Sequence, residues 1–172
     1  MNIKSASATL GMTLVTVGLL IAIPRANAAT TVSTADKDFI LAAAQGGMTE
    51  VKLGELAARK AVRDDVKAFG KLMVKDHSAI NDDLKALAAQ KNVTLPDSLD
   101  AQHQRTVDKM AALKGSEFDD AYIASMINDH KADAKEFKAE AAETNDADIK
   151  SFLGKSIPIV DKHLQRITAM NK

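Results

Sequence analysis

The strongest constraint on the fold is a helical spacing of apolar side chains that repeats along most of the chain. From residue 33 onward, apolar residues recur every three or four positions, and no segment alternates apolar and polar residues with the strand period of two. One such stripe contains Val66, Phe69, Met73, His77, Ile80, Leu84 and Leu87. Because the 172 residues include only 8 Gly and 3 Pro, few positions interrupt a helix. The sequence therefore predicts an all-α protein.

Breaks in this pattern divide the chain into four long helices and one short helix. The predicted ranges are 34–61, 64–91, 98–113, 116–143 and 145–170. Short turns should make the first two long helices, and likewise the last two, into antiparallel hairpins. A long crossover, which includes the short extra helix, joins the two hairpins. We therefore predict a four-helix bundle.

The first 28 residues are predicted to be a signal peptide. Lys4 supplies a positive start, residues 10–23 form an uncharged apolar run, and Ala26–Ala28 is a small-x-small pattern read by signal peptidase. The apolar run is shorter than the ~20 residues of a spanning helix. We expect cleavage after about Ala28, which leaves a four-helix domain over 29–172. The expected location is the periplasm, and association with the envelope or the outer membrane is a further possibility. An uncleaved membrane anchor is the alternative.

Composition excludes several classes of function. Removal of the segment with Lys4 and Arg25 leaves 21 basic and 23 acidic residues, a net charge of −2, which argues against nucleic-acid binding. The chain has no Cys, so disulfides, thiolate metal sites, c-type haem and a lipoprotein anchor are excluded. It also lacks a Gly-x-Ser-x-Gly elbow and a phosphate-cradling glycine loop, which leaves hydrolase and nucleotide-binding functions without support.

Three histidines replace apolar residues in the predicted stripes. His77 and His130 lie near the midpoints of their helices, and His163 lies about one turn beyond the middle of the last helix. Midpoints of helices of similar length meet at the centre of a bundle. We therefore expect the three rings to converge there.

Residues 46–50 are at the matching level of the first helix, which places Glu50 beside the histidines, with Glu55 as a competitor for the inner face. Imidazoles with one carboxylate form a ligand set for a transition metal such as Cu, Zn or Fe. A shared ion requires the rings to lie within about 7 Å of one another.

Other residues near this level could contribute to such a site. The thioethers of Met48, Met73 and Met126 are soft ligands suited to copper. The pair Gly46-Gly47 costs ~1 kcal/mol per residue relative to Ala, so a space-making role is expected. Pro158 is expected to kink the last helix beside His163.

A purely structural explanation is also open for each of these residues. The histidines could be buried side chains hydrogen-bonded to aspartates, for which the candidates are Asp76, Asp129 and Asp161. A methionine at helical spacing is usually core filler. His103 has no comparable neighbours and is expected at the surface.

Two segments give the sequence a family resemblance. The stretches Ala42–Ala57 and Phe69–His77 contain Glu-Val-x-Leu-Gly-x-Leu-Ala and Met-x-x-Asp-His, and together they resemble a ferritin-like family of unknown function. Its members are bacterial exported proteins that are often labelled outer membrane proteins. The resemblance implies a ferritin-like four-helix bundle with a crossover and favours Glu50 over Glu55 as the inner acid. It implies no activity.

The sequence lacks the iron-binding motif of the di-iron proteins that share the ferritin-like fold. These proteins use Glu-x-x-His, whereas here Val74, Ile127 and Val160 stand three residues before the histidines. The leading interpretation is a non-enzymatic periplasmic protein that binds a metal or small ligand in envelope maintenance or stress. The alternatives are a redox metalloenzyme that uses the same residues and a structural or interaction domain without a ligand. The sequence defines neither the ligand nor the oligomeric state.

Overall fold

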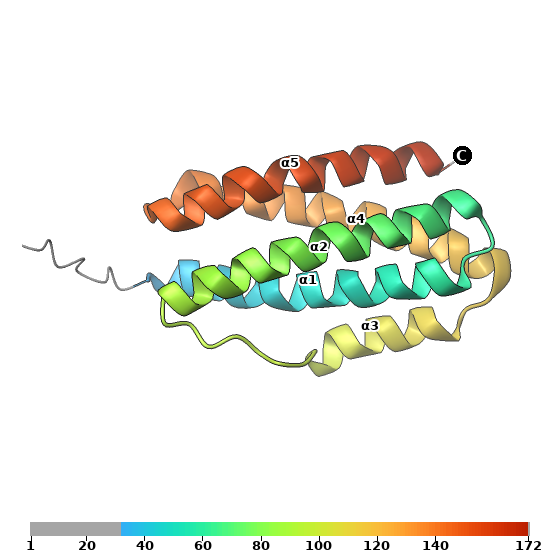
Figure 1. The fold of residues 1–172 in the computed structure, drawn as a ribbon, viewed down its shortest axis with the longest axis horizontal. Coiled ribbons are helices and arrows are strands. Elements are labelled where there is room, and N and C mark those ends of the chain that lie inside the picture. The colour runs from blue at the N-terminus through green and yellow to red at the C-terminus, as the bar shows by residue number, and fades with distance from the viewer. Residues whose placement is uncertain (1–31, 172) are drawn as a thin grey trace, which may run out of the picture.

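The structure is a computed structural model that describes residues 32–171, and within them it contains five α-helices and no strand (Figure 1). The helices are α1 (Thr34–Lys60), α2 (Asp64–Gln90), α3 (Ala101–Ala112), α4 (Gly115–Glu143) and α5 (Ala147–Met170). The predicted all-α fold is confirmed. The predicted signal peptide, residues 1–28, lies outside the described part of the chain. No helix of residues 32–171 combines the length and apolar character needed to cross a membrane.

The long helices form two antiparallel hairpins, α1–α2 and α4–α5, joined by a crossover that contains α3 (Figure 1). α2 ends at the opposite end of the bundle from the start of α4, and the crossover runs back along the outside of α1. As a result α2 and α4 point in the same direction, as do α1 and α5. This is the predicted architecture, and it lets all four long helices contribute to one central layer.

Two helices begin later than the sequence analysis predicted. α3 starts at Ala101 rather than 98, because the Asp100 carboxylate accepts hydrogen bonds from the N–H groups of Gln102 and His103. α5 starts at Ala147 rather than 145, because Asp146 caps it in the same way. Asp100 and Asp146 therefore define where these two helices begin. Ser33 caps α1, and its hydroxyl accepts a hydrogen bond from the Asp36 N–H.

The turn between α1 and α2 is held by a residue from the other hairpin. No side chain of the turn caps α2. Instead, Asp119 of α4 accepts hydrogen bonds from the N–H groups of Val62 and Arg63, at 3.1 and 2.7 Å. Asp119 is buried, so this bond couples the two hairpins at one end of the bundle.

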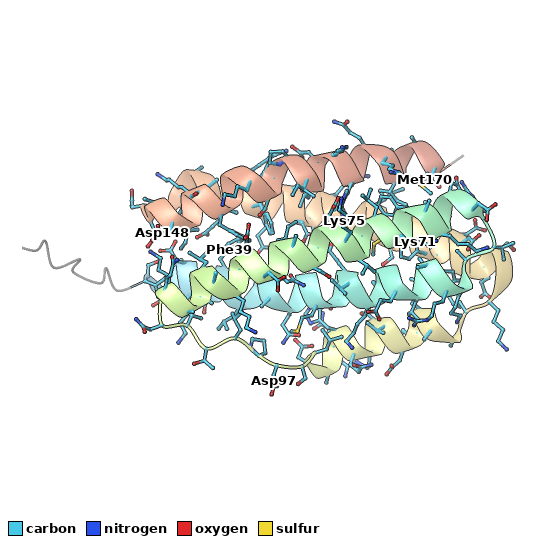
Figure 2. The ribbon with its side chains drawn as sticks, viewed as in Figure 1. Phe39, Lys71, Lys75, Asp97, Asp148 and Met170 are labelled. Carbon is cyan, nitrogen blue, oxygen red and sulfur yellow. The ribbon has the colours of Figure 1, made fainter. Side chains whose placement is uncertain are left out.

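The apolar core consists of two clusters on either side of the bundle's midpoint. One cluster includes Leu53, Phe69, Tyr122 and Ile167, and the other includes Ile40, Leu84, Phe137 and Phe152. Side chains fill the space between the helices, with Phe39 turned inward and Lys71 and Lys75 on the outer face of α2 (Figure 2). Between the two clusters lie four buried polar residues, Glu50, His77, His130 and His163.

Two glycines let α1 and α2 approach closely beside this layer. A Cβ added at Gly70 would lie 2.7 Å from both Ala57 Cβ and the Gly54 carbonyl oxygen. A Cβ at Gly54 would lie 2.9 Å from the Gly70 carbonyl oxygen. The absence of side chains at both positions therefore fixes the spacing of this hairpin.

Candidate metal centre

Three histidines from three helices meet at the centre of the bundle. His77 of α2, His130 of α4 and His163 of α5 are at most 2% exposed. Their ring centroids are 5.3 to 5.6 Å apart, and one ring nitrogen from each lies within 4.8 Å of one from each of the others. The predicted convergence is confirmed, and the separation satisfies the limit for a shared ion.

Each ring has one nitrogen hydrogen-bonded to an oxygen at its outer edge. His77 Nδ1 lies 2.8 Å from Glu50 Oε2, and His163 Nε2 lies 3.0 Å from Asp76 Oδ2. His130 Nδ1 donates to the Met126 carbonyl oxygen at 3.0 Å. Such outer oxygens are the groups that orient ligating histidines in metal sites.

The other nitrogen of each ring is not bonded to an outer oxygen. His77 Nε2 lies 3.3 Å from His163 Nδ1. His130 Nε2 is buried and has no hydrogen-bond partner among residues 32–171. Because a buried polar atom without a partner costs ~1–3 kcal/mol, its presence suggests a group that binds there.

Proton positions between His77 and His163 depend on Glu50. The Asp76 carboxylate only accepts, so His163 donates from Nε2 and its Nδ1 has a lone pair. If Glu50 is protonated, it donates to His77 Nδ1, and His77 Nε2 donates to His163. If Glu50 is ionised, His77 donates to it instead, and two lone pairs face each other across 3.3 Å. A cation can bridge that second arrangement.

Burial keeps the three rings neutral. It lowers the pKa of His77 to about 4 and that of His130 to about 3. Burial also lowers the pKa of His163, although the hydrogen bond to Asp76 opposes the change. Imidazoles that are neutral at pH 7 have the protonation state that a metal ligand needs.

A carboxylate pair lies next to the rings. Glu50 is buried, whereas Glu55 is exposed and pairs with Arg59, so the predicted choice of Glu50 as the inner acid is correct. Burial raises the pKa of Glu50 and of Asp133, and each acid is close enough to affect the other. Glu50 Oε1 lies 3.6 Å from His130 Nδ1 and has no hydrogen-bond partner in the described chain.

The methionines and Pro158 occupy less direct positions. Met73 and Met126 are fully buried in the apolar cluster one helical turn before His77 and His130. Met48 is half-buried and lines an outer cavity with Lys52, away from the rings. Pro158 lies within an uninterrupted α5, five residues before His163.

The two adjacent glycines of α1 have different surroundings. A Cβ at Gly47 would lie 2.0 Å from Asn81 Oδ1, so this glycine makes room for the Asn81 side chain. A Cβ at Gly46 would meet no atom of residues 32–171 within 4 Å. The predicted space-making role therefore applies to Gly47 through packing, while Gly46 borders open space.

Sequence reasoning missed Asp133. This residue stands three positions after His130 and so shares its helix face. His103 lies near the surface as expected, with a side chain 33% exposed that pairs with Asp100, and it lines a solvent-open cavity with Asp129 and Asp133. Of the aspartates considered as histidine partners, Asp76 is one, Asp129 accepts from Ser125, and Asp161 pairs with Lys138.

Comparison with known proteins identifies the family. Residues 22–170 match the family described as a domain of unknown function, DUF4142. The chain belongs to the DUF4142 family. This confirms the resemblance to a family of unknown function, and no finding supports the outer-membrane label. No curated protein matches the sequence at a significant level.

Two solved structures share the fold of this DUF4142 protein. One, described as CopM in the Cu(I)-bound form, has a TM-score of 0.66 and 17% identity over 78% of this chain and 94% of its own. The other, a DUF305 fragment from Deinococcus radiodurans, has a TM-score of 0.70 and 8% identity over 81% of this chain and 96% of its own. At these identities the likeness shows the all-α bundle alone.

Proposed function

We propose that this DUF4142 protein binds one transition-metal ion in the bacterial envelope, with His77, His130 and His163 as ligands. Copper in its monovalent state is the first candidate, and Zn²⁺ or Fe²⁺ are the alternatives. Glu50 completes the set of residues around the ion, and Met73 and Met126 supply an apolar, sulfur-rich layer beneath it. The proposal describes a binding protein rather than an enzyme.

The observation that supports the proposal most strongly is the arrangement of ring nitrogens. Three neutral imidazoles are each held by an outer oxygen, and one nitrogen from each lies within 4.8 Å of one from each of the others. For metal–nitrogen bonds of ~2.05 Å, the 3.3 Å between His77 Nε2 and His163 Nδ1 corresponds to an N–metal–N angle of ~107°. This is close to the tetrahedral angle, so these two rings could hold one ion as they stand.

Charge and ligand type favour copper among the metals that imidazole suits. A buried ion must be balanced by charge, and monovalent copper needs less compensation than a divalent ion. Glu50 and Asp76, hydrogen-bonded to two of the rings, are placed to supply it. CopM, which has the same fold, is described in a Cu(I)-bound form, and this adds support for copper.

The proposed location follows from the sequence of residues 1–28, which has the features of a cleavable signal peptide. We propose that the mature domain, residues 29–172, works in the periplasm, where a metal-binding protein would sequester or deliver the ion during envelope maintenance or stress. Amino-terminal sequencing of protein from the periplasmic fraction tests this, and a mature chain that begins near Ala29 is expected.

The metal site is tested by metal analysis of protein purified from the periplasm and by titration with Cu(I), Zn²⁺ and Fe²⁺. We expect one ion per chain in the wild type, and loss of at least 100-fold in affinity for His77→Ala and His130→Ala. His103→Ala is the matched control and should bind normally. Unchanged metal content in the His77 and His130 variants would refute the proposal. Turnover of peroxide or oxygen by the loaded protein would favour the redox enzyme instead.

A further inference from the structure

A cavity leads from the surface toward the histidines on the face formed by α1, α3 and α4. It has a volume of about 240 Å³. Gln102, Thr106 and Ala132 line it and are exposed, so the cavity opens to solvent. Its inner wall is formed by Gly46, Glu50 and Asp133.

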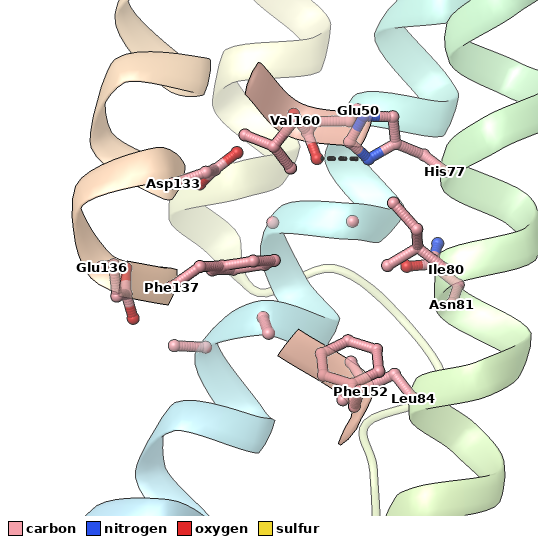
Figure 3. A pocket seen from close by; sticks show the side chains of 14 residues that line it. Glu50, His77, Ile80, Asn81, Leu84, Asp133, Glu136, Phe137, Phe152 and Val160 are labelled. Atoms are coloured by element: carbon pink, nitrogen blue, oxygen red, sulfur yellow. Dashed lines mark ion pairs between the residues drawn. The ribbon is translucent and has the colours of Figure 1, made fainter. Parts of the chain in front are cut away.

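A second, smaller cavity lies on the inner side of the same wall. It has a volume of about 40 Å³, which is room for a few water-sized particles, and His77 lines it (Figure 3). Gly46, Glu50 and Asp133 line this cavity as well. Gly46, Glu50 and Asp133 therefore line both cavities and stand between the outer opening and the cavity beside His77.

Gly46, at the junction of the two cavities, has no side chain and so takes up the least space there. Because no atom of residues 32–171, apart from its chain neighbours and the nearby backbone of its own helix, lies within 4 Å of the position of its Cβ, the space there is unfilled. Gly47, one residue later, faces Asn81 instead and leaves no such space. A helical glycine that packs against nothing is unfavourable relative to alanine, so close packing does not explain Gly46.

The lining of the passage is acidic. Asp129, Asp133 and Glu50 are among its lining residues, with His103 in the outer cavity and His77 in the inner one. Glu50 faces both ways, because its Oε2 contacts His77 while its Oε1 is buried without a partner in the described chain. Carboxyl oxygens in a narrow cleft can bind a passing cation, which takes the place of a proton.

We infer that the metal ion reaches the three histidines through this passage, with Gly46 keeping it open and Asp133 and Glu50 passing the ion inward. The inference rests on the proposed metal site. In this scheme the acids Asp133 and Glu50 affect the rate at which the metal is loaded, whereas the histidines determine the affinity.

The test compares two leucine substitutions. Gly46→Leu fills the junction, and Gly154→Leu places the same side chain at another helical glycine whose Cβ would also meet nothing within 4 Å. Cu(I) is presented as a coloured chelator complex, and its transfer is followed by stopped-flow absorbance. We expect Gly46→Leu to slow loading and release at least tenfold while the final distribution of Cu(I) changes less than twofold. Gly154→Leu should match the wild type.

A variant of equal size gives an independent measurement. Asp133→Asn should slow loading about threefold or more, because an amide binds a cation more weakly than a carboxyl group that can release its proton to the metal. Wild-type loading rates in both Gly46→Leu and Asp133→Asn would overturn the passage but leave the metal site standing if His77→Ala still abolishes binding. Failure of the wild type to bind Cu(I), Zn²⁺ or Fe²⁺ would overturn both.

Discussion

Asp76 of α2 lies 3.0 Å from Nε2 of His163 on α5, although its neighbour in the sequence is His77. The bond crosses between the two hairpins and determines which nitrogen of His163 has the free lone pair. Asp76 thus positions a ring that belongs to the opposite hairpin, and its removal should affect metal binding without removing a ligand.

We expect Asp76→Ala to lower metal affinity by about 10- to 100-fold, because loss of the hydrogen-bond partner of a ligating histidine has an effect of that size in metal sites. Competition against a chelator of known affinity measures the change. Asp161→Ala is the control, since Asp161 pairs with Lys138 and is not bonded to a ring. Equal affinities for the two variants would show that Asp76 does not position His163.

His130→Leu should stabilise the metal-free protein while it abolishes metal binding. The substitution removes a buried Nε2 that has no partner within residues 32–171, and such an atom costs about 1–3 kcal/mol. Urea denaturation in the presence of a chelator should therefore show a gain of about 1–2 kcal/mol. Saturating metal should reverse the order of stability, because only the wild type gains from binding. A destabilised metal-free variant would mean that the ring makes contacts that leucine cannot replace.

The Asp36–Glu140 pair at the far end of the bundle predicts a pH dependence of stability. Burial and the Asp36 carboxyl raise the pKa of Glu140 to about 7, with further contributions from Glu143 and Glu136. Hydrogen bonds, including one to Ser33, lower the pKa of Asp36 against the effect of burial. Lys91 lines a surface cavity together with Asp36 and Glu140, but it is already paired with Asp146 and Asp148.

The sign follows from the raised pKa. Between pH 4.5 and 7 the folded protein keeps a proton on Glu140 that the unfolded chain loses, so this contribution to stability falls as the pH rises through that interval. Glu140→Gln should remove this part of the pH dependence and be more stable than the wild type at pH 8. Thermal unfolding from pH 4 to 8 provides the measurement, with the exposed Glu117→Gln as control. A wild-type pH profile in Glu140→Gln would contradict the assignment.

Gly70→Ala should destabilise the protein by about 1–3 kcal/mol, because a methyl group there overlaps Ala57 and the Gly54 carbonyl oxygen. Gly154→Ala, at an exposed position of α5, should instead stabilise it by about 1 kcal/mol through helix propensity. Urea denaturation of the two variants measures both changes. A stabilised Gly70→Ala would show that α1 and α2 can separate without cost.

The helices and the central layer were predictable because they depend on periodicity and length. Stripes of apolar residues determine which faces meet, and the midpoints of helices of similar length meet whichever way the hairpins are joined. The convergence of His77, His130 and His163 follows from those two facts. The selection of Glu50 needed the family resemblance, because Glu55 fits the helical pattern equally well.

The details of the site depend on distances between helices, which a pattern does not contain. Asp76 bonds to His163 rather than to a ring of its own helix, and that choice depends on how close α2 and α5 lie. Asp100 caps α3, and Gln45 of α1 holds this start in place. The Gln45 side-chain N–H donates to the Ser98 carbonyl oxygen, and Gln45 Oε1 accepts from the Asp100 N–H. The passage at Gly46 is a property of empty space, and no residue pattern predicts it.

The polar layer between the two apolar clusters also fixes the alignment of the four long helices along the bundle axis. If one helix slid by a turn, a histidine would enter an apolar cluster and an aliphatic side chain would take its place among the remaining nitrogens. Both changes bury polar atoms without partners, so the slipped bundle would be penalised at two levels at once. An Ala-rich bundle with no cysteine has few other means of selecting one axial arrangement. The four buried residues that select it are Glu50, His77, His130 and His163.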